Sequence, residues 1–399
     1  MPSSSQLNED QLISSFWESY SGDSTPHSGR REHLWLYHSI NIPFPTTPLR
    51  QALLSLAYVR AGRLQHSRNL VLKGQEIYGQ ALRLMQSALY SPELMLNDEI
   101  LAAARCMVLY EAFESTSGDM AAWQNHIMGI GRIIQLRGPT RHRGPLSNSI
   151  LESMRYSAMI VSLTRRESSF FGNPDWVMQP WRDTSKDVHQ RLYDYGFTLS
   201  NLFHMGETAH QHSGGAEFLR ILEQIRDSYR GMEMLHEELL SVRTEHPHPL
   251  NVDALHELPF GDTTYAITSA TLLALDLAFS TFAAALIEKS SSDFLNEHQD
   301  LLREISSHTD PPRRRALSKQ VLRLLQYCLQ TRVEHTRSKA IFPLSVVRWE
   351  LRAIPEDHAQ VQALFDTIAS AGQFRIARSV QNAGRAMLPS VVAWTSNKG

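Results

Sequence analysis

The side chains best suited to proton chemistry are those of Glu111 and His126. A carboxylate and an imidazole within hydrogen-bond reach can exchange a proton, as general acid–base couples do. The same two groups can instead satisfy each other inside a helical core, as polar groups buried there usually do. We favour this second interpretation, and we therefore expect no catalytic residue and favour a role that is not enzymatic.

His126 lies in the stretch WQNHIMGIGRIIQLRGP, residues 123–139, which has the pattern of one helix. One row at helical spacing is apolar and contains Met120, Trp123, Ile127, Ile130 and Ile134. A second row beside it contains Ala122, His126, Gly129 and Ile133. Glycine lowers the stability of a helix interior by about 1 kcal/mol relative to alanine. We expect Gly129 to be kept because another helix approaches closely there.

The end of this helix is also marked in the sequence. Gly138 should stop the helix and Pro139 should prevent its restart. The positive charge of Arg137 in the last turn interacts favourably with the negative end of the helix dipole. In the preceding helix, Glu111 ends a row that is otherwise apolar. A buried carboxylate needs a partner, so we expect Glu111 to pair with His126 or Arg137 across a helical hairpin.

The rest of the chain repeats the helical pattern and contains no convincing alternating strand. TPLRQALLSLAYVRAGR and GQEIYGQALRLMQSALY are examples, with Thr47 expected as the N-cap of the first and Pro48 as its first residue. The sequence therefore predicts an all-α fold with a single large helical bundle domain. We expect residues 1–30 to form a flexible N-terminal arm and residues 31–399 to form the bundle.

Composition and charge exclude several classes of protein. Hydrophobic residues make up 42% of the 399 residues and charged residues 20%, which is typical of a globular chain. The 39 basic and 41 acidic residues give a net charge of -2, whereas nucleic-acid binders usually carry a basic excess. We expect no direct DNA contact.

The cysteines, the N-terminus and the most apolar segment give further expectations about compartment and membrane association. Cys106 and Cys328 cannot form a disulfide framework or a closed cysteine zinc site, and they fit a reducing compartment, the nucleus or the cytosol. The N-terminus lacks the features of a secretion signal. The run from Ala266 to Lys289 is long enough to cross a bilayer, but the charge of Asp276 near its centre favours a buried core helix over a membrane span.

Histidine pairs and a loop rich in tryptophan give weaker signals. The pairs His210/His212 and His246/His248 have no fixed third ligand, so we predict solvated histidines, no metal site and no cofactor. The loop NPDWVMQPWRD, residues 173–183, either lines a ligand pocket or plugs the core with its tryptophans.

A short basic run, PPRRRALSK, contains Arg313, Arg314 and Arg315. We favour the solvated first turn of a helix, and a nuclear import patch or an anion contact is the alternative. Three arginines at a helix start oppose the helix dipole, which mildly favours an acidic partner.

The order of these features resembles the fungal-specific transcription factor domain. The resemblance is carried by Tyr110-Glu111, a short loop, and then Trp123, His126, Gly129 and Arg137-Gly138-Pro139. PLRQALLSLAYVRAG, YGQALRLMQSAL and IFPLSVVRWELRAIPEDHAQVQALFDTI are also similar to segments of that family. The resemblance covers most of the chain and implies that Glu111, Trp123, His126, Gly129, Arg137 and Gly138 form a structural signature and line a candidate pocket.

The resemblance implies a regulator of transcription that acts in the nucleus. Regulators of this family usually carry a zinc cluster with six cysteines, and the sequence has two cysteines in total. We therefore expect it to act through other transcription regulators or co-activators, to respond to a small-molecule effector, and to control metabolic genes, including those of secondary metabolism. The alternative is an enzyme or small-molecule binder on the same scaffold, with a cytoplasmic location as the alternative to the nucleus.

The polar groups expected near the apolar interior are the first candidates for such an alternative function: Glu111, His126, Arg137 and Asp276. A large enclosed pocket in which Glu, His, Arg and Tyr side chains converge would favour the enzyme or binder. A filled core with an exposed apolar patch would favour a regulator that binds partners.

Overall fold

Helices form all the regular secondary structure of the residues that the structure describes. This computed structural model describes residues 4–21, 34–114, 116–117, 120–212, 215–244, 262–330, 338–371 and 376–382. Within these ranges there is no strand, so the predicted all-α fold is confirmed.

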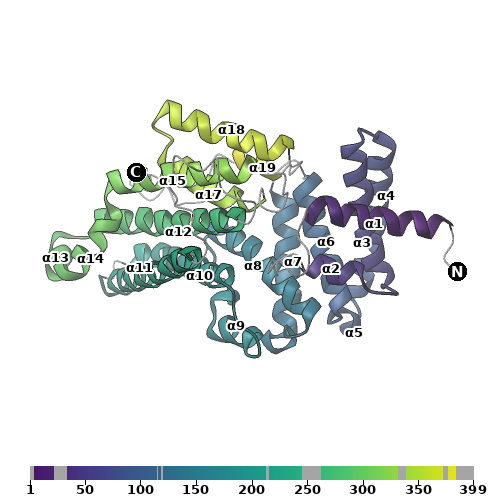
Figure 1. Cartoon of the computed structure of the whole chain (residues 1–399). Helices are drawn as coiled ribbons and strands as arrows, with labels where there is room; N and C mark the ends of the chain where they lie inside the picture. Colours follow the sequence, from purple (N-terminus) through teal and green to yellow (C-terminus); the bar gives the residue numbers. More distant parts are fainter. Residues whose placement is uncertain are drawn as a thin grey trace.

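The first half of the described chain holds the signature hairpin and the two leading helices of the family resemblance. They are α1 (Ser4–Ser21), α2 (Leu34–Ile40), α3 (Thr47–Leu64), α4 (Arg68–Leu89), α5 (Pro92–Met95), α6 (Asp98–Glu114), α7 (Ala121–Arg137), α8 (Pro145–Arg165) and α9 (Pro174–Met178). Short 3₁₀ turns lie at Pro139–Arg141, Phe170–Gly172 and Gln179–Trp181. In Figure 1, α3, α4 and α6 lie on the right, and α8 lies between them and the second group of helices.

The second half forms a bundle around a long apolar helix. Its elements are α10 (Val188–His212), α11 (Gly215–Thr244), α12 (Asp262–Lys289), α13 (Ser292–Glu297), α14 (Gln299–Thr309), α15 (Pro311–Gln330), α17 (Ile341–Glu350), α18 (Pro355–Ala371) and α19 (Ile376–Asn382). In Figure 1, α12 runs between α10 and α11 on one side and α15 and α17 on the other. One continuous apolar cluster joins both groups, from Ile13 in α1 to Val380 in α19.

The helix α12 lies inside the protein, as its composition predicts. Among the described residues it is the helix that is long and apolar enough to cross a membrane, and 83% of its most apolar window is buried by other parts of the protein. Its small and hydroxyl-bearing residues include Ala274, Ala278 and Ser280, all of them fully buried. Small side chains let neighbouring helices pack closely on several faces, and hydroxyl groups can bond to the helix backbone.

The expectation of a flexible N-terminal arm is wrong for residues 4–21, which form α1. Ile13, Phe16 and Tyr20 lie on one face of this helix and are buried. The rings of Phe16 and Tyr20 meet Phe113 of α6 edge-on, with centroids 6.4 and 6.2 Å away. Because the segment is mostly polar, its narrow apolar face is difficult to recognise in the sequence. Burial of that face stabilises the helix packed against the rest of the protein. Residues 22–33 lie outside the described part.

The pair α3 and α4 packs very closely because glycines lie at the crossing. A Cβ atom on Gly74 would lie 2.8 Å from the backbone nitrogen of Val59, and one on Gly62 would lie 2.7 Å from that of Val71. The α4 residues Ile77, Ala81, Leu84 and Ala88 recur at helical spacing; Leu84 is half-buried and the other three are buried. The N-cap of α3 is Thr46 rather than Thr47, a shift within the usual uncertainty of helix boundaries.

Candidate functional site

The helices α6 and α7 carry the residues that the sequence singles out. Four members of the predicted apolar row of α7 are buried: Trp123, Ile127, Ile130 and Ile134. The helices α6 and α7 pack directly against each other, so the predicted hairpin and its apolar face are confirmed.

The carboxylate of Glu111 is 2% exposed and is held by neutral donors. The hydroxyl of Tyr78 donates to its Oε1 at 2.8 Å, and Thr116 donates through its backbone N–H at 3.1 Å and through its hydroxyl at 2.7 Å. His126 Nε2 lies 3.9 Å from Glu111 Oε1 and 3.0 Å from the Tyr78 hydroxyl. Tyr78 therefore links the predicted pair, and its ring stacks on Tyr110 at 3.7 Å.

The electrostatics of this cluster follow from burial beside one negative charge. Burial raises the pKa of Tyr78, and the neighbouring carboxylate of Glu111 raises it further. Burial lowers the pKa of His126, although Glu111 opposes that effect. Both shifts favour neutral partners around one buried carboxylate. Such an arrangement ties α4, α6 and α7 together by hydrogen bonds.

Arg137 does not reach Glu111, so that alternative for the partner of Glu111 is wrong. Its guanidinium donates to the carbonyl oxygen of Leu96 and to the carboxylate of Asp98. The side chain is 3% exposed and joins the end of α7 to the start of α6. Burial and the nearby charge of Arg137 lower the pKa of His142 to about 4.

The two glycines of the signature have different roles. Gly138 follows the last residue of α7 and has φ +76° and ψ 158°, so the predicted helix stop is confirmed. Gly129 is exposed and a Cβ atom there would meet nothing within 4 Å. The expected close approach of another helix at Gly129 is therefore wrong. The side of the second row that holds Gly129 faces solvent, and packing gives no reason for glycine there.

A small cavity lies beside the signature hairpin. Its volume is about 60 Å³ and its lining includes Trp123, Met120, Arg105 and Tyr156. Of the six signature residues, Trp123 alone belongs to this lining. The space holds about two waters at their share of liquid volume and is too small for a drug-sized ligand.

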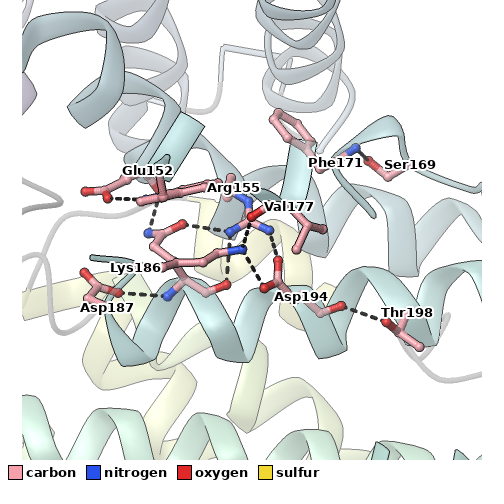
Figure 2. Close-up of polar contacts among 11 residues, drawn as sticks. Glu152, Arg155, Ser169, Phe171, Val177, Lys186, Asp187, Asp194 and Thr198 are labelled. Carbon is pink, nitrogen blue, oxygen red and sulfur yellow. Dashed lines mark hydrogen bonds and ion pairs between the residues drawn. The ribbon is translucent and has the colours of Figure 1, made fainter. Parts of the chain in front are cut away.

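The tryptophans of the loop 173–183 are buried, which favours the interpretation that they plug the core. Trp181 donates from Nε1 to Glu152 Oε1 at 2.9 Å, and the guanidinium of Arg155 lies 5.0 Å from the centre of its ring. Figure 2 shows Asp194 of α10 between Arg155 and Lys186, with interactions to both.

This cluster is a buried ionic network that the sequence does not reveal. The side chain of Arg155 is 0% exposed and also donates to the backbone and side-chain oxygens of Gln190. Burial, followed by the charge of Arg155, lowers the pKa of Lys186 to about 8, against the opposing effect of Asp194. These ion pairs and hydrogen bonds join α8 to α10, so we assign the network to stability.

The largest pocket that we describe lies between α11, α12, α14 and α15. It opens to solvent and has a volume of about 350 Å³. Its lining combines apolar and ionisable side chains from the four helices: Tyr229, Met232, Glu233, His236, Glu237, Leu272, Leu273, Asp276, His308, Arg313, Leu317 and Gln320. Mixed lining of this kind is typical of small-molecule sites, and the volume is at the lower end of their range.

Asp276 is the centre of the polar network in this pocket. Arg313 donates two hydrogen bonds to its carboxylate, at 2.7 and 3.2 Å, and Ser280 donates a third at 3.1 Å. The imidazole of His308 stacks on the ring of Tyr229 at 3.8 Å and lies 3.6 Å from Asp276. Burial alone would raise the pKa of Asp276, but the hydrogen bonds and charges of His308 and Arg313 lower it.

Among the four polar residues named as first candidates, Asp276 alone lines this pocket. Its lone carboxylate in an apolar helix was the sequence signal that could have located the site. Tyr229, His308 and Arg313 come from three other helices, and no local pattern shows that they converge. Glu111, His126 and Arg137 belong to the signature hairpin instead.

The basic run lies at the start of α15 and is partly engaged within the protein. Arg313 binds Asp276, and Arg314 Nε lies 3.5 Å from Glu350 Oε1, while Arg315 is exposed. An import patch needs accessible charges, so this geometry disfavours the patch, which stays a prediction.

The expected histidine pairs lie outside what the structure describes: the side chains of His210 and His212 are not described, and His246 and His248 fall in residues 245–261. In the described part of the chain no group of three His, Cys, Asp or Glu residues could hold a metal ion. Cys106 and Cys328 are buried thiols, and burial raises the pKa of each to about 12, so both remain protonated core residues.

Comparisons with known proteins agree with this architecture. The family model of the fungal specific transcription factor domain matches residues 12–387. Among curated proteins, the uncharacterized protein AN5342 of Emericella nidulans is 28% identical over 115 residues, which are 29% of this chain and 24% of that protein. The chain therefore matches about a quarter of the length of that relative. No solved structure matches. Because the family model covers most of the sequence, the chain belongs to the fungal-specific transcription factor domain family.

Proposed function

We propose that this chain regulates the transcription of a metabolic gene set through protein partners that contact DNA. The observation that carries the proposal is the match of the fungal transcription factor family over residues 12–387. The net charge of -2 supports the assignment of DNA contact to a partner, because a DNA-binding surface usually needs a basic excess. The partners are other regulators or co-activators, and the location is the nucleus.

Deletion of the gene, followed by transcript profiling beside metabolite profiling, tests this proposal. We expect a coordinated fall in the transcripts of one metabolic gene set, including secondary-metabolite genes. Restoring the chain should return those transcripts to their original level. Unchanged transcripts together with accumulation of one pathway intermediate would contradict regulation and indicate catalysis.

The pocket between α11, α12, α14 and α15 supports a second candidate function, the binding of a small molecule. The pocket has a volume of about 350 Å³, and Tyr229, Glu233, His308 and Arg313 converge on it. A ligand in this pocket would shift the equilibrium between two conformations of the helical bundle only if it binds one conformation more tightly than the other. Binding of a small molecule is therefore compatible with two roles: a transcription regulator controlled by an effector, and a protein whose only function is to bind the small molecule.

A further inference from the structure

We infer that the pocket between α11, α12, α14 and α15 binds a small organic amine with an apolar body. This inference deepens the proposed function, because it names the chemical class of the effector. It depends on three features of the lining: the balance of charge, an apolar wall and the imidazole of His236.

The balance of charge favours a cationic ligand. Among the residues that line the pocket, Arg313 is the only lysine or arginine, and Asp276 neutralises it with two hydrogen bonds. Glu233 and Glu237 lie one helical turn apart on α11. Glu233 Oε1 lies 3.6 Å from His308 Nε2, and neither carboxylate has a lysine or arginine partner among the lining residues. An ammonium group at the mouth would gain two carboxylates, whereas a carboxylate group would meet like charges.

The apolar wall fits the body of such a ligand. Met232, Leu272, Leu273 and Leu317 come from α11, α12 and α15 and line the same pocket. Apolar ligand surface placed against these side chains is removed from water, which favours binding in proportion to the area covered. A fully hydrated ion would gain nothing from this wall, so a simple metal cation is a poorer match.

An imidazole provides the remaining polar contact. His236 lines the pocket, and its Nδ1 atom is buried, so the imidazole can meet a ligand through Nε2. An imidazole nitrogen either accepts or donates a hydrogen bond, and His236 can therefore pair with an ammonium group or with a hydroxyl group on the ligand.

Calorimetric titration of the full chain with three matched probes tests this inference. The probes are 2-phenylethylamine, the neutral 2-phenylethanol and the anionic 3-phenylpropanoate. We expect the amine to bind with a Kd about tenfold below that of the alcohol, because two partly exposed ion pairs together give a factor of that order. The anion should bind more weakly than the alcohol.

Two variants show whether the amine occupies the proposed pocket. The double change Glu233→Gln with Glu237→Gln should raise the Kd of the amine about tenfold and remove its preference over the alcohol. Glu223→Gln is the matched control, because Glu223 is exposed on the same helix outside the lining. Leu317→Trp, which fills the apolar wall, should weaken the amine and the alcohol alike.

Four outcomes would overturn the inference. They are equal binding of amine and alcohol, tightest binding of the anion, an unchanged Kd in the double glutamine variant, and no binding of the amine up to its solubility. If any of these occurs while gene deletion still lowers the transcripts, the ligand class is wrong and the proposed function stands. If the amine binds as expected but transcripts do not change, the proposed function fails and the binding site stands.

Discussion

Glu111 is buried, and its carboxylate accepts hydrogen bonds from Tyr78 and Thr116 rather than from a full positive charge. Glu111→Ala would leave those donors without their acceptor. Because unpaired buried polar groups are costly, we expect the free energy of unfolding to fall by about 1–3 kcal/mol. Denaturant unfolding measures this change. Glu76→Ala on the exposed face of α4 is the control, and equal stability of the two variants would contradict a role for Glu111 as a tie.

The stability of the protein should fall in mild acid because of His142. Its pKa is lowered from 6.5 to about 4 in the folded protein. The unfolded chain therefore takes up the proton first as the pH falls, so the contribution of neutral His142 is full above pH 6.5 and is lost towards pH 4. We expect a loss of about 2 kcal/mol between pH 7 and pH 5, measured by urea unfolding at both values.

His142→Gln separates this residue from the other titrating groups. The variant should show a smaller loss of stability over the same pH range, while His204→Gln, a change at an exposed position, should keep the full loss. An identical pH dependence in all three proteins would show that His142 binds its proton equally well in the folded and unfolded chains.

For single residues, the sequence shows which buried side chains need a hydrogen-bond partner. It shows less well which residue that partner is. Glu111 ends an apolar helical row, which is a local pattern, and so its burial could be predicted. Tyr78 lies on a different helix, and nothing in the spacing places its hydroxyl between Glu111 and His126. The partner of Arg137 is Asp98 for the same reason: packing of α6 on α7 decides it, and a carboxylate at a helix start suits an arginine at the end of its antiparallel neighbour.

Among the helices, Gly129 within α7 and Gly138 directly after it should respond to alanine in opposite directions. Gly138 has φ +76° and ψ 158°, a region that residues with a Cβ atom avoid, so Gly138→Ala should destabilise by about 1–3 kcal/mol. Gly129 is helical and exposed, with nothing near its Cβ position. Gly129→Ala should therefore stabilise by about 0.5–1 kcal/mol, and thermal unfolding of both variants provides the comparison.

The same comparison decides whether Gly129 has another role. If Gly129→Ala destabilises the chain, close contact at that position exists in solution and our interpretation of the exposed row is incorrect. If Gly138→Ala has no effect, the backbone there adopts another conformation.

Docking of α1 gives a prediction at the level of a whole element. Phe16→Ala should lower the free energy of unfolding by about 3 kcal/mol, since the ring is buried against Tyr20 and Phe113. Phe44→Ala makes the same chemical change at a ring that is 94% exposed, and it should have almost no effect. A similar small effect for both would indicate that α1 is not docked in solution.

The sequence predicts that a segment forms a helix far better than it predicts where that helix packs in the protein. The apolar row of α7 has a strong local period, so its buried face was correctly predicted. The segment that forms α1 is polar on most of its surface, and its three buried residues gain their environment from α2, α3 and Phe113 of α6. Whether such a segment docks depends on surfaces made elsewhere in the chain, which is information that a local pattern does not contain.

For the whole molecule, the family and the all-α architecture could be predicted from the order and spacing of segments along most of the chain. The pocket between α11, α12, α14 and α15 could not, because its polar groups come from four helices and meet only after the bundle has formed. Asp276 was visible as an unusual charge in an apolar helix. Its partner Arg313 was visible only as a member of a basic run.

The position of α12 in the order of synthesis has a consequence for biogenesis. This apolar helix leaves the ribosome before α15 and α17, two of the helices that cover it. At about 5–20 residues per second, the side of α12 that these two helices later cover stays exposed for seconds. During this interval the nascent polypeptide resembles a client of the membrane-insertion machinery. Cytosolic chaperones should therefore bind the growing chain most strongly just after Lys289 emerges.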